Sequence, residues 1–217
     1  MTQVMLKLAA TDERLKYLEK RDAVVDSLQV TVFQLQNELK AQAQANLRNE
    51  VEMVGIPENL SENLHHIVLV AAKKIGLDLE DADIDWVSRV GPRRPPVSAK
   101  LPEDGARMPR PIVVRLLRRA KRDQFLKSAK SRNNFSSTDL GIIGESRKVF
   151  FNERLTKENR VLFRDTRSRA KLHGYAFCWC SQGVIYVRQR EGKAASPIRS
   201  KNDMDRLLPP SLPTISS

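Results

Sequence analysis

The feature that most restricts the fold is a heptad pattern from Leu18 to Leu39, in an N-terminal segment that has no proline or glycine before Gly55. Apolar side chains repeat with a seven-residue period, which places them along one side of a helix and is typical of coiled coils. Residues 1–49 are therefore predicted to form a self-associating coiled coil. A mixed valine and leucine seam fits a dimer or a trimer, and the alternative is an amphipathic helix packed on its own domain. The predicted oligomerisation positions are Leu18, Val25, Leu28, Val32, Leu35 and Leu39.

Residues 50–146 alternate between strand and helix patterns. A helix follows the first strand and is expected to begin at a capping box of Asn59 and Glu62 and to end at Gly76. A second, basic helix follows the third strand. The order β-α-β-β-α-β predicts a ferredoxin-like domain of the RNA-recognition type, interrupted by a basic, proline-rich loop at 91–111. The predicted strands are 51–56, 84–90, 112–117 and 140–143.

Residues 147–208 predict a second, small domain. Thr156 is placed to cap a helix over 157–173, and a Ser-Gln-Gly turn separates two strand-like stretches. Ser200 is placed to cap a last short helix, and residues 209–217 are predicted to be a disordered tail. The chain is thus predicted to be α+β, with a coiled coil, a ferredoxin-like domain and a small helix/β-hairpin/helix domain.

The net charge of +12 is unevenly distributed. Residues 51–90 hold three bases and eight acids, residues 91–135 thirteen bases and three acids, and residues 136–217 fifteen bases and eight acids. This excess predicts a polyanionic partner. Single-stranded nucleic acid is placed ahead of an anionic membrane, because no stretch is long and apolar enough for membrane insertion. A solvated face or a nuclear-localisation run is the alternative interpretation.

No catalytic residue, metal site or cofactor is predicted. The nine glycines are scattered singly, and no phosphate-binding loop, metal-ligand spacing or Ser/His/Asp motif occurs. Cys178 and Cys180 are too close in sequence for an unstrained disulfide within a strand, so both are predicted to be free thiols in a reducing compartment. Together with the missing signal-peptide pattern, this predicts an intracellular protein, nuclear, cytoplasmic or both.

Three blocks carry a family resemblance: Val-Glu-Met-Val-Gly-Ile-Pro-Glu from 51, Pro-Ile-Val-Val-Arg from 111, and Phe-Asn-Glu-Arg-Leu-Thr from 151, which runs on to Gly-Val-Ile-Tyr-Val-Arg from 183. They resemble the baculovirus few-polyhedra (FP) protein family and its insect relatives. In layout they are also similar to the RNA-binding first-reading-frame protein of LINE-type retrotransposons. That second likeness implies a coiled-coil trimer with an RNA-recognition domain and a small C-terminal domain, which coats RNA and acts as a nucleic-acid chaperone.

The resemblance implies RNA contacts at particular positions of this chain: Arg89, Arg93, Arg94, Arg110, Lys130, Arg132 and Arg160. The strands at 51–56 and 112–117 depart from RNA-recognition domains because they contain no aromatic residue for base stacking. Binding is therefore expected to depend on the charge of the nucleic-acid backbone, with little sequence preference.

Charge pattern and resemblance together predict a single-stranded nucleic-acid interface, with RNA favoured over DNA. Four cations of the 157–173 helix, Arg160, Arg164, Arg167 and Lys171, fall on one side of it and form a basic stripe. This stripe is expected to face the same cleft as the basic run 107–132. The alternative is a coiled-coil structural or assembly protein of the viral FP type without a nucleic-acid function. The predicted binding residues are Arg89, Arg93, Arg94, Arg107, Arg110, Arg118, Arg119, Lys121, Arg122, Lys130, Arg132, Arg160, Arg164, Arg167 and Lys171.

Overall fold

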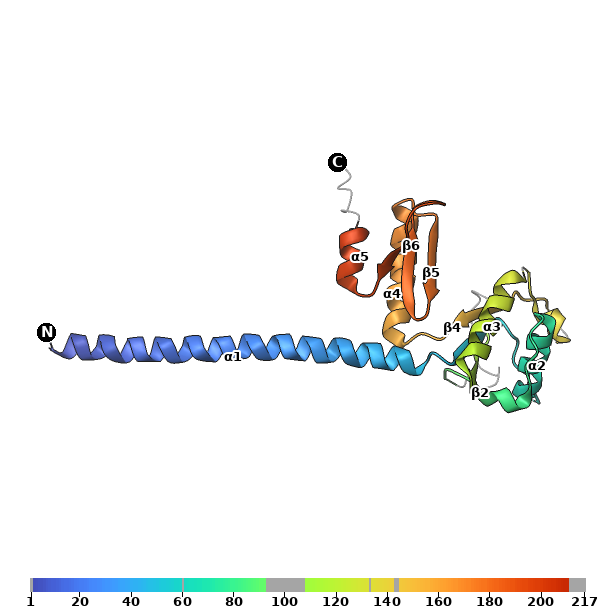
Figure 1. The fold of residues 1–217 in the computed structure, drawn as a ribbon, viewed down its shortest axis with the longest axis horizontal. Helices are drawn as coiled ribbons and strands as arrows, with labels where there is room; N and C mark the ends of the chain where they lie inside the picture. The colour runs from blue at the N-terminus through green and yellow to red at the C-terminus, as the bar shows by residue number, and fades with distance from the viewer. Residues whose placement is uncertain (1, 60, 93–107, 133, 143–144, 211–217) are drawn as a thin grey trace, which may run out of the picture. The chain divides into compact units, whose positions relative to one another are not determined.

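A computed structural model describes residues 2–59, 61–92, 108–132, 134–142 and 145–210 (Figure 1). The chain divides into two compact units, Met1–Ala45 and Asn46–Ser217. The first unit is helical, and the second combines helices with antiparallel strands, which confirms the predicted α+β class and the long N-terminal helix. No described helix is both long enough and apolar enough to cross a membrane.

Helix α1, Thr2–Asn46, covers nearly all of the predicted coiled-coil segment. It continues for 45 residues because no proline or glycine interrupts its hydrogen-bond ladder. The heptad side chains lie on the helix surface, from 37% exposed at Leu18 to 67% exposed at Leu39. Pairing of this seam with another copy of α1 stays a prediction.

Four antiparallel strands form the first sheet, in the order β2-β3-β1-β4. Val51 lies opposite Val114 on one side and Glu153 on the other, so β1 and β3 are the central strands, as their apolar sequences favour. The strands are β1 Glu50–Val54, β2 Ile84–Arg89, β3 Ile112–Leu116 and β4 Phe150–Glu153.

Helices α2, Leu64–Lys74, and α3, Arg119–Ser131, supply the helical part of the first core. Val68 of α2 and Phe125 of α3 are fully buried in one cluster with Met53 of β1. The alternation of β1 places its glutamates on the opposite face of the sheet. The helices therefore cover one face, and the other face is left to polar contacts.

The fourth strand was predicted at 140–143, and this is wrong. Leu140 ends a 3-10 helix, Ser137–Leu140, and the strand begins ten residues later at Phe150. The physical reason is packing: the ring of Phe151 lies 5.6 Å from that of Phe125, so β4 brings an aromatic side chain into the core. Residues 143 and 144 lie outside the described residues.

The predicted capping box of α2 is also wrong. The N-cap is Asn63, whose side chain accepts a hydrogen bond of 3.0 Å from the backbone N–H of His66. Glu62 is directed instead to Arg89, with which it makes an ion pair. A buried guanidinium without a carboxylate costs more free energy than a helix cap contributes, so the ion pair determines where Glu62 points.

Gly55 allows the segment before β4 to pass close to the end of β1. Its φ is +97°, and a Cβ at this position would lie 2.2 Å from the carbonyl oxygen of Lys148. Only glycine fits both the backbone angle and the close approach.

The C-terminal region forms a second sheet, in the order β5-β6-β7, with its own core around Ala170, Ile185 and Met204. Thr156 and Ser200 cap its two helices, as predicted, by accepting hydrogen bonds from backbone N–H groups three residues later. Strand β7 is not among the predicted strands. The elements are α4 Lys157–Leu172, β5 Phe177–Ser181, β6 Val184–Arg188, β7 Ser196–Ile198 and α5 Lys201–Leu207.

Candidate nucleic-acid interface

A groove of about 670 Å³ lies between the first sheet and the C-terminal sheet. Its lining comes from β1, β4, the end of α3 and the residues before β3 on one side, and from α4 and β5 on the other. Cations from the basic run and from the α4 stripe both line it, although they are far apart in the sequence. These are Arg110, Lys130, Arg160 and Arg167.

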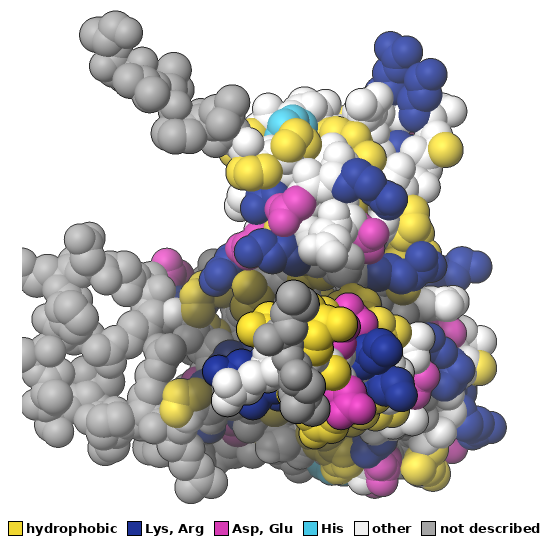
Figure 2. Space-filling model, turned by 90° about the vertical axis from the view of Figure 1, so that its left-hand side faces the viewer, with side chains coloured by type: hydrophobic (Ala, Val, Ile, Leu, Met, Phe, Trp, Pro, Cys, Tyr) yellow, Lys and Arg dark blue, Asp and Glu magenta, His cyan; other side chains and the backbone are white. Residues whose placement is uncertain are grey.

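Eight other predicted cations that the structure describes are not part of the groove lining. Arg93, Arg94 and Arg107 lie outside the described residues. On the face drawn in Figure 2, Lys and Arg side chains are interspersed with Asp and Glu rather than forming an unbroken basic field. The described cations outside the lining are Arg89, Arg118, Arg119, Lys121, Arg122, Arg132, Arg164 and Lys171.

Glu52 is the main acid of the groove. Its carboxylate accepts hydrogen bonds from Arg160, at 3.2 Å to both oxygens, and from Arg154 at 2.8 Å. The side chain of Glu52 is 9% exposed, whereas that of Arg160 is 51% exposed. Burial raises the pKa of the neighbouring Glu50 carboxyl, despite the attraction of Arg115 and Arg154. The face of the sheet that lacks helices is therefore acidic and closed by arginines, and Arg160 can meet a phosphate only in competition with Glu52.

Glu153, at the end of β4, ties the first sheet to the C-terminal hairpin. Its carboxylate accepts the backbone N–H groups of Gln182 at 2.9 Å and Gly183 at 2.8 Å. It also lies 3.5 Å from the guanidinium of Arg122, whose side chain is 5% exposed. Arg122 was predicted to bind nucleic acid, but this position is interior and its charge is matched within the protein.

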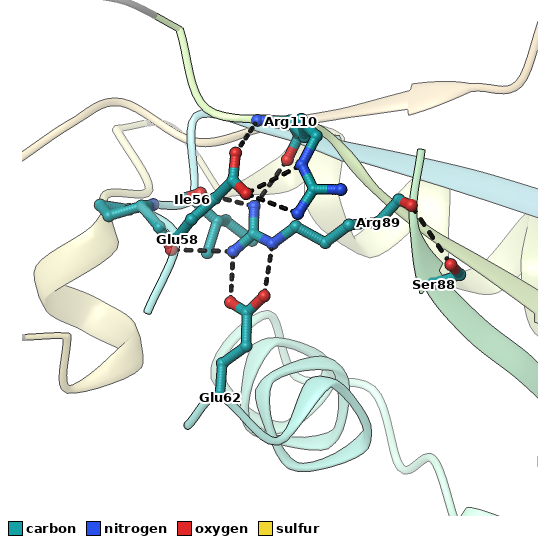
Figure 3. Close-up of polar contacts among 7 residues, drawn as sticks. Ile56, Glu58, Glu62, Ser88, Arg89 and Arg110 are labelled. Carbon is teal, nitrogen blue, oxygen red and sulfur yellow. Dashed lines mark hydrogen bonds and ion pairs between the residues drawn. The ribbon is translucent and has the colours of Figure 1, made fainter. Parts of the chain in front are cut away.

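Arg89 is likewise interior, with a side chain that is 4% exposed (Figure 3). It donates to both carboxylate oxygens of Glu62, at 2.8 and 2.6 Å. It also donates to the backbone carbonyls of Ile56, Pro57 and Arg110, at 2.9, 2.8 and 2.6 Å. Five hydrogen bonds from one guanidinium hold the end of β2, the turn after β1 and the start of β3 together. Arg89 was predicted to lie near RNA, but all five of its guanidinium N–H groups donate to partners within the protein and position three parts of the fold.

Arg110 lies beside this cluster and pairs with Glu58 (Figure 3). Its Nε and one terminal nitrogen donate to the same Glu58 oxygen at 2.8 and 2.7 Å, and its backbone N–H donates to the other at 2.8 Å. The hydrogen bond from the Arg110 side chain lowers the pKa of Glu58, so that carboxyl stays charged well into acid. Arg110 therefore reaches the groove with its charge already matched.

Cations at the start of α3 pair with an acid from another element, which the sequence pattern does not reveal. Asp83, in the 3-10 helix Asp81–Asp83, lies 2.8 Å from Arg118 and 3.2 Å from Lys121. Burial disfavours the charged form of Asp83, but the backbone N–H of Glu80, Lys121 and Arg118 outweigh it and hold its pKa below the usual value. Two of the cations at this helix N-terminus, Arg118 and Lys121, are thus offset by one carboxylate, which precedes Arg118 by 35 residues.

At the other end of α3, Arg132 also makes internal contacts. It donates to the carbonyl of Lys74, lies 3.6 Å from Asp139 and stacks over the ring of Phe135. In contrast, Lys130 and Arg167 line the groove with no carboxylate within ion-pair distance among the described residues. Lys171 and Arg164 continue the exposed side of α4 beyond the groove. Among the described residues, the one acid within ion-pair distance of Arg164 is its sequence neighbour Asp165, at 3.5 Å. These cations, and Arg119 at the start of α3, which is exposed and makes no ion pair among the described residues, are the available part of the predicted interface.

Cys180 lines the groove but is expected to be unreactive. Burial raises the pKa of its thiol to about 12, and the adjacent Glu153 carboxylate, 3.7 Å from the sulfur, acts in the same direction. An unfolded cysteine ionises near pH ~8.5. In a Cys178→Ala chain at pH 8, alkylation of Cys180 by iodoacetamide should be at least about a hundredfold slower than in the urea-denatured chain.

The raised pKa of the Cys180 thiol also makes the free energy of unfolding depend on pH. The folded pKa is higher than the unfolded one, so the contribution of Cys180 is complete below the unfolded pKa and is lost as the pH rises toward about 12. The rate of alkylation, followed by mass spectrometry, depends on the thiolate fraction and on the access of the reagent to the sulfur. Equal rates in the native and denatured chains would contradict a buried, neutral thiol.

Comparison with known families gives one match. Residues 156–208 match Baculovirus FP protein domain 2. The matched segment begins at the N-cap of α4 and ends at Leu208, the last buried side chain of the C-terminal core. No curated protein matches the chain. The FP resemblance predicted from the sequence is confirmed, and the likeness to retrotransposon proteins stays a prediction.

Proposed function

We propose that this chain, whose C-terminal region matches the baculovirus FP protein domain 2, binds single-stranded nucleic acid through the groove, with RNA favoured over DNA and little sequence preference. The observation that carries the proposal is the convergence of Lys130, Arg160 and Arg167 on one groove from two separate helices. Lys130 and Arg167 have no acid partner among the described residues, so a phosphate would satisfy charges that the fold leaves open. The chain would act as a binding protein in the nucleus, the cytoplasm or both, and without catalysis.

We further propose that the first sheet and its helices form a ferredoxin-like domain of the RNA-recognition type. The element order β-α-β-β-α-β and the strand order β2-β3-β1-β4 support this, with all pairs antiparallel. Such domains stack bases on the sheet face that lacks helices, but here Glu50 and Glu52 are buried on that face. Nucleic acid would therefore bind beside the sheet, in the groove, and not across it.

Self-association through α1 belongs to the same proposal. Leu28, Val32 and Leu35 are each more than half exposed on the single helix, and an apolar seam of this kind is stable in water when another helix covers it. Two or three copies would place several grooves on one strand and raise the overall affinity by effective concentration. This arrangement fits a protein that coats RNA, as a retrotransposon-like ribonucleoprotein or chaperone does.

A second candidate function is a structural or assembly role of the viral FP type. The exposed seam of α1 favours it independently of the groove, because a coiled coil can organise an assembly without nucleic acid. In that case the cations serve solubility. Substitutions of the seam would alter the behaviour of the protein, and substitutions in the groove would not.

Salt dependence tests the groove. Binding of labelled oligouridine to the full chain, followed by fluorescence anisotropy, should weaken with salt with a slope of about −2.8 for four phosphate contacts. Lys130→Ala/Arg167→Ala should make the slope shallower by about 1.4, because two phosphates lose their cations. Glu52→Gln should raise the affinity, since it removes the carboxylate that competes for Arg160.

The matched control is Lys73→Ala/Arg199→Ala. It removes the same two charge types from exposed positions outside the groove lining, and neither side chain makes an ion pair among the described residues. The backbone N–H of Arg199, which donates to Asp203, is retained in alanine. It should keep the slope of the unmodified chain. Equal affinities and slopes for the two double variants would refute the groove as the binding site and leave the assembly role.

A further inference from the structure

The outer face of the C-terminal sheet carries a cluster of aromatic rings that serves neither core. Trp179 lies opposite Tyr186 across β5 and β6, and Phe177 lies opposite Arg188. The rings of Trp179 and Tyr186 are stacked, with centroids 5.6 Å apart and planes 18° apart. The guanidinium of Arg188 lies 4.4 Å from the centroid of Phe177 and 5.7 Å from that of Trp179. We call these four residues the aromatic face.

Strand alternation explains why the aromatic face lies outside the core. Ile185 and Val187, which flank Tyr186 on β6, are 1% and 0% exposed and pack in the C-terminal core. Their neighbours on the strand must therefore point the other way. Phe177 is 38% exposed, and none of the three rings of the face belongs to either core cluster. Three aromatic side chains are thus placed on a surface where burial does not account for them.

The aromatic face is continuous with the groove. Trp179 lines the groove together with Phe163, over whose ring the guanidinium of Arg167 lies at 5.5 Å. Arg188 has no acid partner among the described residues, and its Nε is buried without a hydrogen-bond partner there. Arg188 lies beside Trp179 on the aromatic face, and Arg167 lines the same groove as Trp179; neither arginine makes an ion pair among the described residues.

We infer that the aromatic face is a base-stacking platform for the same single strand whose phosphates the groove cations bind. This inference rests on the proposed function and extends it from backbone charge to the bases. Flat rings beside unpaired arginines suit unpaired nucleobases, because every base has a π-face and every nucleotide a phosphate. A duplex keeps its bases stacked on one another, so the platform would also favour single strands over double strands. The aromatic side chains that β1 and β3 lack are then supplied by the C-terminal sheet.

Cross-strand aromatic pairs also stabilise hairpins, so the test must separate packing from ligand binding. Trp86→Phe leaves Trp179 as the only tryptophan of the full chain. Oligouridine and an abasic oligomer of equal length carry the same phosphates, and only the first has bases. Oligouridine should quench the fluorescence of Trp179 and bind at least about fivefold more tightly for each stacked base than the abasic oligomer.

Two variants of the aromatic face complete the design. Trp179→Leu/Tyr186→Leu keeps apolar side chains in the hairpin but removes the flat rings, and circular dichroism checks that it folds. It should bind oligouridine as weakly as the abasic oligomer, with an unchanged salt slope. Arg188→Ala leaves the rings in place and should lower oligouridine affinity more than abasic affinity.

The outcomes distinguish the two proposals. If both oligomers bind the unmodified chain equally well, with the salt dependence of the groove, the stacking platform is refuted and the proposed function stands. If neither oligomer binds, both proposals fail. A Trp179→Leu/Tyr186→Leu chain that folds and still prefers oligouridine as before also overturns the platform.

Discussion

Replacement of Arg89 by alanine should destabilise the unit 46–217 by about 3–5 kcal/mol, the usual cost of removing one partner from a buried ion pair. The side chain is 4% exposed and donates five hydrogen bonds. Alanine would leave the Glu62 carboxylate, which is 15% exposed, without its cation. It would also leave the carbonyls of Ile56, Pro57 and Arg110 without this donor.

Urea unfolding measures this effect, with the fluorescence of Trp86, in the same strand as Arg89, as the probe. Arg89→Lys should recover only part of the loss, because an ammonium cannot reproduce the forked geometry of the guanidinium. The matched control is Arg115→Ala on β3, whose side chain is 39% exposed and lies 3.8 Å from Asp85. Removal of such a surface pair should cost about 0–1 kcal/mol.

The same variant separates a positioning role from a direct RNA contact. If Arg89 touched RNA, as was predicted from the likeness to retrotransposon proteins, alanine would lower the affinity and leave the free energy of unfolding nearly unchanged. The contacts in the structure predict the opposite: alanine should lower the free energy of unfolding strongly and change the RNA affinity of the folded chain little. A change in unfolding free energy below about 1 kcal/mol would show that the five hydrogen bonds contribute little.

The second large effect is expected at α1: Leu28→Asp/Leu35→Asp should convert the self-associated chain to a monomer. These residues occupy successive d positions of the heptad pattern, and both are exposed on the single helix. In a coiled coil each aspartate would carry a charge into an apolar seam, which costs several kcal/mol per group, and every copy would contribute two. Loss of the assembly should also weaken binding to long oligonucleotides, since several grooves would no longer share one strand.

Sedimentation equilibrium of the full chain measures this prediction directly. The control is Ser27→Asp/Gln34→Asp, which adds the same charges one residue earlier in each heptad, at c positions away from the seam. It should sediment as the unmodified chain does. A monomeric unmodified chain, or an oligomer that survives both leucine substitutions, would contradict self-association through this seam.

In the unit 46–217, acids of the segment 51–90 pair with cations from other segments, as the uneven charge distribution already suggested. The acidic segment 51–90, with its eight acids, supplies the partners of several cations that the sequence predicted as nucleic-acid ligands. Arg160 meets Glu52, Arg110 meets Glu58, Arg89 meets Glu62, and both Arg118 and Lys121 meet Asp83. The opposite signs of neighbouring segments were a visible signal that part of the basic excess is neutralised inside the fold.

Local order could be predicted because it depends on residues close together in the chain. The absence of proline and glycine determines α1, side-chain oxygens determine the starts of α4 and α5 at Thr156 and Ser200, and alternation determines β1 and β3. The basic stripe of α4 follows from helical periodicity alone. These features need only the periods of helix and strand and the chemistry of a cap.

Only the tertiary structure decided which of the predicted cations remain available. Arg122 and Lys130 lie on one helix, yet the first is buried against Glu153 and the second is exposed in the groove. Their roles depend on how β4 pairs with β1 and where the β5–β6 turn meets Glu153, and these are contacts between segments far apart in the chain. By itself the sequence determined the elements and the amount of charge. The pairing of distant acids with bases determined where that charge is free, because Coulomb energy depends on separation in space and on burial, not on separation along the chain.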